Sequence, residues 1–472
     1  MNLSNSLNAP IFQQLREVAK EQNLESYVVG GYVRDLLLKR ESKDIDFVCI
    51  GPGIKLAEAV HEKLGTHLPL TVFKSFGTAM IKNGELELEF VGARKESYSR
   101  ESRKPIVEDG TLEDDQNRRD FTINAMAISL NQENYGELVD PFNGVNDLKE
   151  RVIRTPLDPQ VTFSDDPLRM MRAIRFATQL NFDIEADTFE AITGMADRIE
   201  IVSGERIIVE LNKIIMCEKP SYGFKLLFFS GLLKKFFPEM VALQGVQTFQ
   251  DKSHKDNFYH TLQVLDNICE STDDLWVRWS AILHDIAKPA TKRFNKKTGW
   301  TFHGHEDRGA RMTPSIFRRL KLPLGSEMKK VQKLVRLHLR PIALSKVQIT
   351  DAAVRRVLYE AGDDTDDLMK LCRADITSKN QNKVERFLKN FDLVEERMRE
   401  VEEKDKIRNF QPVITGELIM ATFNLPPGRI VGEMKEALKE AVLEGIIENE
   451  YDQAFAFLLK IGKDRQLKVV DN

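Results

Sequence analysis

Two aspartates separated by one residue end a short polar segment near the start of the sequence. Asp44 and Asp46 lie in the stretch GGYVRDLLLKRESKDIDFV, residues 30–48, where DIDFVCIG predicts a buried strand. Because residues i and i+2 of a strand point to the same face, we expect the two carboxylates side by side. Without a cation they would repel, and one would protonate. Carboxylates that share substrate phosphates are typical of Mg²⁺ sites, which activate an attacking hydroxyl and neutralise a leaving pyrophosphate.

The residues before the aspartates are suited to holding phosphate. Gly30 and Gly31 lie between a predicted strand and a predicted helix, and Arg34 follows on the first turn. Bare backbone N–H groups at such a junction reach an anion. A solvated turn also explains the aspartate pair alone, but GG, RD and DxD in one strand–helix–strand unit favour the site. Glu89 either approaches the metal from an adjacent strand or faces solvent, and Arg94 contacts either triphosphate or loop.

A second segment combines a hydrogen-bond acceptor with a donor. In DDPLRMMRAIRFATQLNF, residues 165–182, we expect Pro167 at the first helical position. Asp166 and Arg169 would then share one helix face. Cytosine and adenine each present an amino donor beside a ring-nitrogen acceptor, which Asp and Arg match, whereas uracil and guanine present the reverse order. Rejecting them is expected to cost about 1–3 kcal/mol. A capped helix with solvated arginines explains the same pattern.

Histidines are concentrated in the second half of the chain. Six of the eight fall between residues 254 and 338, and one of them directly precedes an aspartate in the apolar segment WSAILHDIAKP. Imidazole and carboxylate together suit a divalent transition-metal ion, such as Ni²⁺, Mn²⁺, Fe²⁺ or Zn²⁺. A water bound to such a metal attacks phosphoesters. The alternative is a set of core histidines with satisfied hydrogen bonds. The residues concerned are His260, His284, Asp285, His303, His305, His338 and Asp375.

Composition limits the classes of protein that can carry these segments. The chain has 472 residues, 42% hydrophobic and 30% charged, and a net charge of −4. These values are typical of a globular protein with two to four domains and argue against indiscriminate DNA coating. The sequence has no apolar run long enough for a membrane span and no signal-peptide pattern at its start. Four scattered cysteines predict buried thiols, so the expected location is cytoplasmic.

Hydrophobic patterning predicts an α+β head followed by a long helical body. Up to residue 93 helices and strands alternate, and residues 77–93 predict a hairpin with its turn at Asn83-Gly84. Residues 95–118 are polar without periodicity, which predicts a mobile loop. From about residue 160 the patterns are almost only helical. Residues 318–340 carry eight Lys or Arg against one Glu, which fits either an RNA-backbone track or a solvated helix face.

The first 220 residues or so resemble the class II CCA-adding enzymes and bacterial poly(A) polymerases. The stretch 30–48 is similar to the family's signature, and DDPLR to its base-selecting motif, although this chain has Asp165 where the family usually has Glu. SGERIIVELNKII (203–215) resembles the family's bracing helix, and ARKESY (93–98) begins its flexible loop. RRDFTINAMAIS (118–129) resembles the ribose-contacting motif, which implies nucleotide-binding roles for Arg118, Asp120 and Asn124.

The order His260, His284-Asp285, distant Asp375 resembles the HD phosphohydrolase superfamily, and His305 and His338 fall where its two-metal members have additional histidines. The resemblance implies these six residues as the metal ligands. Together the two resemblances imply a mixed-sheet nucleotidyltransferase head over residues 1–155 and a helical neck with the base-selecting motif over 156–245. An HD domain over 246–385 and a helical, tRNA-binding tail over 386–472 would follow. The implied metals are Mg²⁺ at the transferase site and an unidentified divalent transition metal at the HD site.

The implied function is addition of CCA to tRNA 3′ ends from CTP and ATP, with a possible second phosphohydrolase activity. Three alternatives remain: a poly(A) polymerase, a partial enzyme that adds only CC or only A, and an HD phosphohydrolase with a degenerate RNA-binding head. The complete GG, DxD and DDxxR set argues against the last. The expected partners are tRNA, CTP and ATP, with no membrane, and the oligomeric state is left open.

Overall fold

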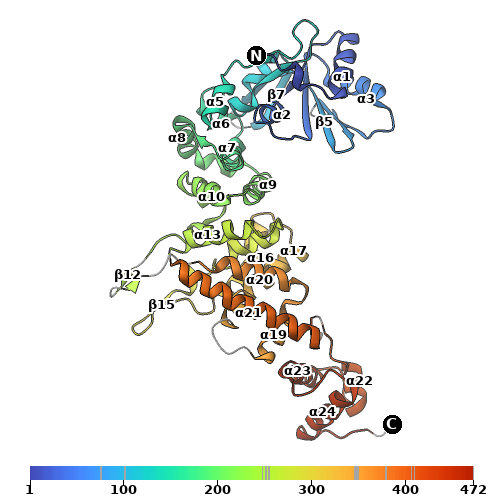
Figure 1. The fold of residues 1–472 in the computed structure, drawn as a ribbon, viewed down its shortest axis with the longest axis vertical. Coiled ribbons are helices and arrows are strands. Elements are labelled where there is room, and N and C mark those ends of the chain that lie inside the picture. The colour runs from blue at the N-terminus through green and yellow to red at the C-terminus, as the bar shows by residue number, and fades with distance from the viewer. Residues whose placement is uncertain are drawn as a thin grey trace. The chain divides into compact units, whose positions relative to one another are not determined.

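The computed structural model describes most of the chain (Figure 1). The described residues are 1–74, 77–99, 102–246, 248–249, 252–253, 256–344, 350–377, 380–405, 407–408 and 410–470. The chain divides into two compact units, Met1–Pro238 and Glu239–Asn472. Each unit carries one of the two constellations found in the sequence, so each is described by itself.

A seven-stranded mixed sheet forms the centre of the first unit, in the order β3-β4-β5-β2-β1-β8-β9. β2 and β5 run parallel, and the other neighbouring strands pair antiparallel. The predicted hairpin over 77–93 is confirmed as β4 and β5. The strands are β1 Ser26–Val29, β2 Asp44–Cys49, β3 Leu70–Phe73, β4 Thr78–Asn83, β5 Leu86–Gly92, β8 Ala127–Ser129 and β9 Leu138–Val139.

Three helices, α1 (Pro10–Glu21), α2 (Gly31–Leu37) and α3 (Gly53–Leu64), accompany the sheet. α1 packs against α3, and α3 packs against β4 and β5. The apolar stripe of α1 is buried, as expected for a helix with one core-facing side. The short α2 leads from β1 to β2, so it holds the glycine pair and the aspartate pair close together.

The prediction of an irregular loop over residues 95–118 is wrong. Strands β6 (Arg94–Ser99) and β7 (Ser102–Asp109) pair as an antiparallel ribbon, and α4 (Leu112–Asn117) follows. Thr111 begins α4 with a capping box, in which its side chain and that of Asp114 each accept a hydrogen bond from the other residue's backbone N–H. The capping box therefore stabilises α4, a helix that the polar composition of this segment did not indicate.

The rest of the first unit is helical, as predicted. Helix α7 packs against α9 and α10 and is buried along most of its length. Short strands β10 (Val152–Ile153) and β11 (Asp183–Ile184) pair in parallel. The helices are α5 Gly144–Glu150, α6 Pro159–Asp165, α7 Leu168–Leu180, α8 Ala186–Gly194, α9 Gly204–Ile215, α10 Pro220–Phe229 and α11 Leu232–Phe236, and α12 Pro238–Val241 follows at the division.

One detail of the base-selecting segment differs from expectation. Helix α7 begins at Leu168, and Asp166 precedes it with φ −138° and ψ 100°. A residue before proline is pushed out of the helical region by the proline ring, so Asp166 lies outside the helix. The backbone N–H of Arg169 still donates to the carbonyl of Asp166 at 2.9 Å, which keeps both residues in one turn.

The second unit is a helical body with two small hairpins. α13, α14, α16, α17 and α20 pack around a common centre, and α22 to α24 enclose a separate apolar cluster. The hairpins are β12 Thr248–Phe249 with β13 Lys252–Ser253, and β14 Arg293–Asn295 with β15 Gly299–Thr301. The helices are α13 Asn257–Cys269, α14 Leu275–Leu283, α15 Lys288–Thr291, α16 His305–Arg319, α17 Ser326–Leu337, α18 Leu339–Leu344, α19 Asp351–Ala361, α20 Thr365–Asp375, α21 Gln381–Asp405, α22 Gly416–Phe423, α23 Arg429–Glu444 and α24 Tyr451–Asp464. Among the described residues, no helix combines the length and the apolar character needed to cross a bilayer.

Candidate functional site

Carboxylates from two parallel strands meet in the first unit. Asp46 on β2 lies directly opposite Glu89 on β5, and Asp44 precedes Asp46 on the same face. Burial raises the pKa of Asp46, the positive charge of Arg119 opposes this shift, and the neighbouring Asp44 adds to it. Burial and then the charge of Asp46 raise the pKa of Glu89. These hard oxygen ligands repel one another, so the cluster fits a divalent cation such as Mg²⁺.

Gly30 brings bare backbone against the carboxylates. Its φ of 74° is a left-handed conformation that side chains rarely adopt. A Cβ built on Gly30 would lie 3.0 Å from Nη1 of Arg119 and 3.1 Å from Oδ2 of Asp46. Only glycine therefore joins β1 to α2 at this point without strain.

Two arginines that line the same cavity as these carboxylates are each held by a polar side chain. Nη1 of Arg34 donates to Oδ1 of Asn124 at 2.9 Å, and Nε of Arg172 donates to Oδ2 of Asp120 at 2.7 Å. Asn124 in turn donates to Oδ1 of Asp120 at 3.1 Å. Burial by itself raises the pKa of Asp120, but the charge of Arg172 outweighs it and holds the pKa below its usual value. This network fixes two cations where a triphosphate can bind.

The buried ring of Phe176 supports the same arginines. The Cζ atoms of Arg34 and Arg172 lie 5.1 Å and 5.4 Å from the ring centroid, and that of Arg175 lies 3.8 Å away. Arg175 is also paired with the buried Glu210, with Nε and Oε2 2.5 Å apart. Cations on an aromatic face are attracted by its quadrupole. Phe176 therefore connects the helix α7 to Arg34 of α2.

These groups line one cavity of about 380 Å³. Seven of the sequence-predicted residues line it, whereas Arg118, Asp166 and Arg169 do not. The sequence had left Glu89 open, had named Arg119 beside Arg118 as a charge for phosphates, and had given no site role to Tyr32, Arg172 or Phe176, all of which line the cavity too. The seven predicted residues are Gly30, Gly31, Arg34, Asp44, Asp46, Asp120 and Asn124.

The three remaining predicted residues lie next to the cavity residues. Arg169 donates through Nη2 to the backbone carbonyl of Arg118 at 2.6 Å. Asp166 is paired with Arg206, whose Nη2 lies 2.8 Å from Oδ2. The charge of Asp166 contributes to raising the pKa of Arg172, and that of Arg169 contributes to lowering the pKa of Asp120. The segment around Asp166 and Arg169 is therefore within electrostatic reach of the cavity.

Asp115 was not predicted from the sequence, yet it positions Arg119. Its buried carboxylate pairs with both Arg118 and Arg119, and its Oδ2 lies 2.9 Å from Nη2 of Arg119. Burial alone raises the pKa of Asp115, but the charges of Arg119 and Arg118 outweigh it and hold the pKa below 3.8. A residue that pins two arginines beside the carboxylate cluster is needed for the geometry of the cavity.

We expect Asp115→Asn to lower the free energy of unfolding by about 3 kcal/mol, since one partner of a buried ion pair is removed. A depressed folded-state pKa stabilises the protein above the unfolded value of 3.8, and this contribution disappears as the pH falls through the folded value. Urea unfolding should therefore separate wild type from variant by the full amount at pH 7 and by less towards pH 3.

The exposed Asp187 provides the matched control for this substitution. Asp187→Asn should leave the unfolding curve within about 0.5 kcal/mol of wild type. Equal stability of wild type and Asp115→Asn at pH 7 would contradict the role given to Asp115.

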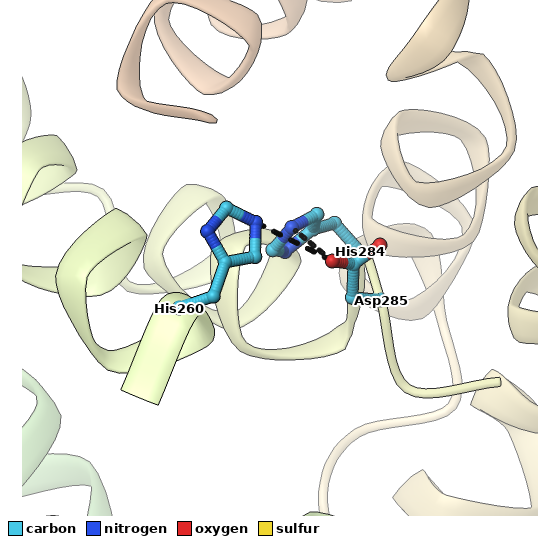
Figure 2. A group of neighbouring side chains, drawn as sticks. All are labelled: His260, His284 and Asp285. Atoms are coloured by element: carbon cyan, nitrogen blue, oxygen red, sulfur yellow. Dashed lines mark ion pairs between the residues drawn. The ribbon is translucent and has the colours of Figure 1, made fainter. Parts of the chain in front are cut away.

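In the second unit, all six predicted metal ligands come from helix ends or the residues next to them. His260 lies on α13, His284 and Asp285 directly follow α14, and His305 begins α16. His338 directly follows α17, and Asp375 ends α20. Figure 2 shows His260 and His284 turned toward the carboxylate of Asp285. Helices far apart in sequence thus bring these side chains to one centre, as in metal sites of helical bundles.

Hydrogen bonds fix the tautomer of three of the histidines. Nδ1 of His284, His305 and His338 each lies 2.7 Å from a backbone carbonyl three residues earlier. A carbonyl only accepts, so Nδ1 carries the proton and Nε2 of a neutral ring presents a lone pair. In all three rings Nε2 is buried and makes no hydrogen bond of acceptable geometry, although an oxygen of Asp285 lies 3.2 Å from Nε2 of His284 and of His305. Buried, oriented lone pairs without a partner are what metal-ligating imidazoles provide, so the residues fit a transition-metal centre.

Asp285 lies at the middle of this centre. Its Oδ2 is 3.4 Å from Nε2 of His260 and 3.2 Å from Nε2 of His284, and its Oδ1 is 3.2 Å from Nε2 of His305. Ligand atoms with metal-site spacing form two groups, His260-His284-Asp285 and Asp285-His305-His338. Because Asp285 belongs to both groups, it would be a ligand in either of them.

Nearby charges divide the histidines of this centre. Burial lowers the pKa of His260, but hydrogen bonds with Asp285 and Asp375 outweigh it and raise the pKa to about 9. Burial, followed by the neighbouring His284, lowers the pKa of His338 to about 4. Nζ of Lys288 lies 2.5 Å from Oδ2 of Asp285, which the sequence did not predict. This lysine partly neutralises the acidic side of the centre.

The basic stretch 318–340 is largely engaged inside the second unit. Nζ of Lys330 lies 2.8 Å from Oδ2 of Asp274, and Nζ of Lys333 lies 2.7 Å from Oδ2 of Asp364. Arg319 is paired with Glu239. Cations that are paired within the protein are less available to bind an RNA backbone. The helix face is therefore not simply solvated, because these cations also form ion pairs.

Comparisons with known proteins match both units. Residues 26–154 match the family described as poly A polymerase head domain, and residues 181–243 the one described as probable RNA and SrmB-binding site of polymerase A. Residues 257–380 match the HD domain family. The matches lie in the order expected from the sequence motifs.

Relatives with described activities align with between 35% and 88% of the chain. It is 32% identical to an A-adding tRNA nucleotidyltransferase of Deinococcus radiodurans over 425 residues, 88% of this chain and 90% of that protein. It is 50% identical to an A-adding tRNA nucleotidyltransferase of Aquifex aeolicus over 165 residues, 35% of this chain and 20% of that protein. Identity to a multifunctional CCA protein of Nitrosococcus oceani is 32%, over 66% of this chain and 73% of that protein.

A solved structure supports the same assignment. A tRNA nucleotidyltransferase complexed with a primer tRNA and an incoming ATP analog matches with a TM-score of 0.54 at 26% identity. The match covers 82% of this chain and 99% of that one. The extent of the relatives, the order of the domains and the two constellations agree. The chain therefore belongs to the class II CCA-adding nucleotidyltransferase and poly(A) polymerase family, with a fused HD domain.

Proposed function

We propose that the protein is a tRNA nucleotidyltransferase that adds CCA to tRNA 3′ ends from CTP and ATP, with release of pyrophosphate. The observation that carries the proposal is one cavity lined both by Asp44, Asp46 and Glu89 and by Arg34 and Arg172. Carboxylates and cations in one cavity suit a metal-bound triphosphate. The tRNA and nucleotide complexes among the structural relatives support the same partners.

Each residue then has a defined part in the transfer. Asp44 and Asp46 would hold Mg²⁺, which when bound neutralises phosphate charge and makes the attacking hydroxyl more acidic. Gly30 and Gly31 leave room for phosphate, and Arg34 with Arg172 binds its oxygens. The 3′ hydroxyl of tRNA attacks the α-phosphate, the new phosphodiester forms, and the bond to pyrophosphate breaks. Positioning and charge stabilisation account for most of such catalysis.

Choice of the base falls to Asp166 and Arg169 in this proposal. The carboxylate accepts a hydrogen bond from the exocyclic amino group of cytosine or adenine, and the guanidinium donates to the ring nitrogen beside it. Arg118, Asp120 and Asn124 lie between this pair and the carboxylate cluster along the sequence, and Asp120 and Asn124 line the cavity. In this proposal they contact the ribose and phosphate part of the nucleotide.

A second candidate is addition of the terminal A alone. The A-adding relatives of Deinococcus radiodurans and Aquifex aeolicus favour it. The Asp–Arg pair does not separate the two candidates, since it matches adenine and cytosine alike. Poly(A) synthesis is a weaker alternative, because the HD domain replaces the basic tail expected of those polymerases.

Single-nucleotide incorporation distinguishes these activities. Purified protein is incubated with Mg²⁺, each labelled nucleotide in turn, and tRNA that lacks CCA or ends in CC. Incorporation of CTP and then ATP on the first substrate, stopping after three residues, supports CCA addition. Incorporation of one ATP on the CC-ended tRNA only, with no use of CTP, supports A addition. Long A tracts would point to a polymerase, and no incorporation on either tRNA would contradict the proposal.

We further propose a divalent transition metal at the centre around Asp285 and a phosphohydrolase activity there. The buried, unpartnered Nε2 atoms of His284, His305 and His338 support this proposal. Metal-dependent release of phosphate from nucleotide or cyclic phosphate substrates would test it.

The four free cysteines fit the expected cytoplasmic location. Helices α22 to α24 form the tail that is proposed to hold the tRNA body.

A further inference from the structure

The contacts of Asp166 point to a residue outside the base-selecting motif. Arg206, in the first turn of α9, reaches both carboxylate oxygens, with Nη1 3.4 Å from Oδ1 and Nη2 2.8 Å from Oδ2. The backbone N–H of Leu168 donates to Oδ1 at 3.1 Å. The carboxylate is therefore held by three donors from two elements, although Asp166 itself lies in extended backbone outside α7.

Three donors leave little freedom to this carboxylate. An ionised carboxylate has about four acceptor positions, so about one remains for a ligand. The exocyclic amino group of adenine or cytosine fills one acceptor position, whereas guanine and uracil present a carbonyl oxygen there. A carboxylate that cannot rotate away would meet this oxygen acceptor against acceptor, which is the repulsive element that specificity requires.

The pair is not needed to hold the fold together. The side chain of Arg206 is 44% exposed and that of Asp166 is 24% exposed. Ion pairs at this exposure contribute little to stability. Helices α7 and α9 are packed through buried apolar residues on both helices, independently of this contact.

We propose that Arg206 is a positioning residue for base selection, which locks the Asp166 carboxylate so that adenine and cytosine are accepted and guanine and uracil are rejected. The inference rests on the proposed function and extends it to a residue on another helix. Arg206 acts through Asp166 and contacts no reacting atom. Its loss should therefore change the preference between bases more than the rate with the correct base.

The test measures kcat/KM for ATP and for GTP on tRNA that ends in CC, because both candidate activities use this substrate. In Arg206→Gln the ATP:GTP ratio should fall about tenfold, part of the discrimination of a bidentate base contact. Arg206→Lys, which keeps the charge but loses the planar fork, should recover part of the ratio. The melting temperature of both variants should stay within about 2 °C of wild type.

Arg154→Gln is the matched control, since Arg154 is 41% exposed and pairs with Asp147 and Glu185 in the same unit. It should leave the ATP:GTP ratio unchanged. An unchanged ratio in Arg206→Gln, or an equal fall in Arg154→Gln, would overturn the inference while leaving the proposed function intact. A wild-type protein that incorporates no nucleotide would instead overturn the proposed function.

Discussion

Asp46→Asn should reduce nucleotide incorporation about 1000-fold while leaving the protein at least as stable as wild type. Metal-assisted charge stabilisation contributes several kcal/mol, and about 4 kcal/mol corresponds to this factor. Burial and the charge of Asp44 already raise the pKa of Asp46, and Asp46 in turn raises that of Glu89. Replacing one of the repelling carboxylates by an amide therefore lowers the activity without lowering the stability of the fold. Such a trade-off between activity and stability is typical of active sites.

Steady-state incorporation of labelled nucleotide and a thermal melt without Mg²⁺ measure the two parts of this prediction. Asp187→Asn, an exposed aspartate of the same unit, is the control and should resemble wild type in both. Retention of more than about a tenth of the activity in Asp46→Asn would remove this carboxylate from the proposed metal site. A large drop in the melting temperature of Asp46→Asn would mean that Asp46 stabilises the fold.

Asp285→Asn should abolish metal binding at the second centre and leave nucleotide incorporation unchanged. Its carboxylate belongs to both ligand groups, so one substitution weakens both sites at once. Since orienting partners of metal ligands alone cost 10–100-fold in affinity, we expect a loss of at least about 100-fold here. Titration of the metal-free protein with Mn²⁺ or Ni²⁺, followed by elemental analysis, measures it, and any metal-dependent phosphatase should disappear in parallel.

His303→Asn is the control for this second prediction, because His303 is an exposed histidine two residues before His305. It should bind metal as wild type does. Wild-type metal affinity in Asp285→Asn would contradict the proposed centre. Loss of incorporation in that variant, with the circular dichroism spectrum preserved, would mean that the two activities do not belong to separate sites.

The carboxylate pair shows what a sequence can predict well. Alternation along DIDFVCIG was sufficient to predict β2 and to place Asp44 and Asp46 on one face, because strand geometry is local. Glu89 stayed open because its position depends on the parallel pairing of β2 with β5. No local pattern states which strands become neighbours, so the third carboxylate needed the structure.

The contacts of the cavity arginines were harder to predict from the sequence. Asp115 lies in a segment that composition made look irregular, although T-x-x-D at Thr111 is a capping signal that was available. Arg172 and Phe176 are i and i+4 on α7, so their shared face could be predicted once the helix itself was predicted. The contact of Arg34, on α2, with the same ring could not be predicted, because it is purely tertiary.

The histidine centre lies between these cases. Clustering and residue type indicated a metal centre, the resemblance to the HD order selected the six residues, and the structure brings them together. The shared position of Asp285 and the contact of Lys288 could not be predicted, since both depend on the angles at which helices meet.

The ring of Phe176 has a consequence for the mobility of the cavity wall. It lies against guanidinium groups from α2 and from α7, the helix that starts next to Asp166. Because the ring is buried and contacts both helices, Arg34 and Arg172 have a common support. A displacement of either helix would therefore disturb the guanidinium group carried by the other.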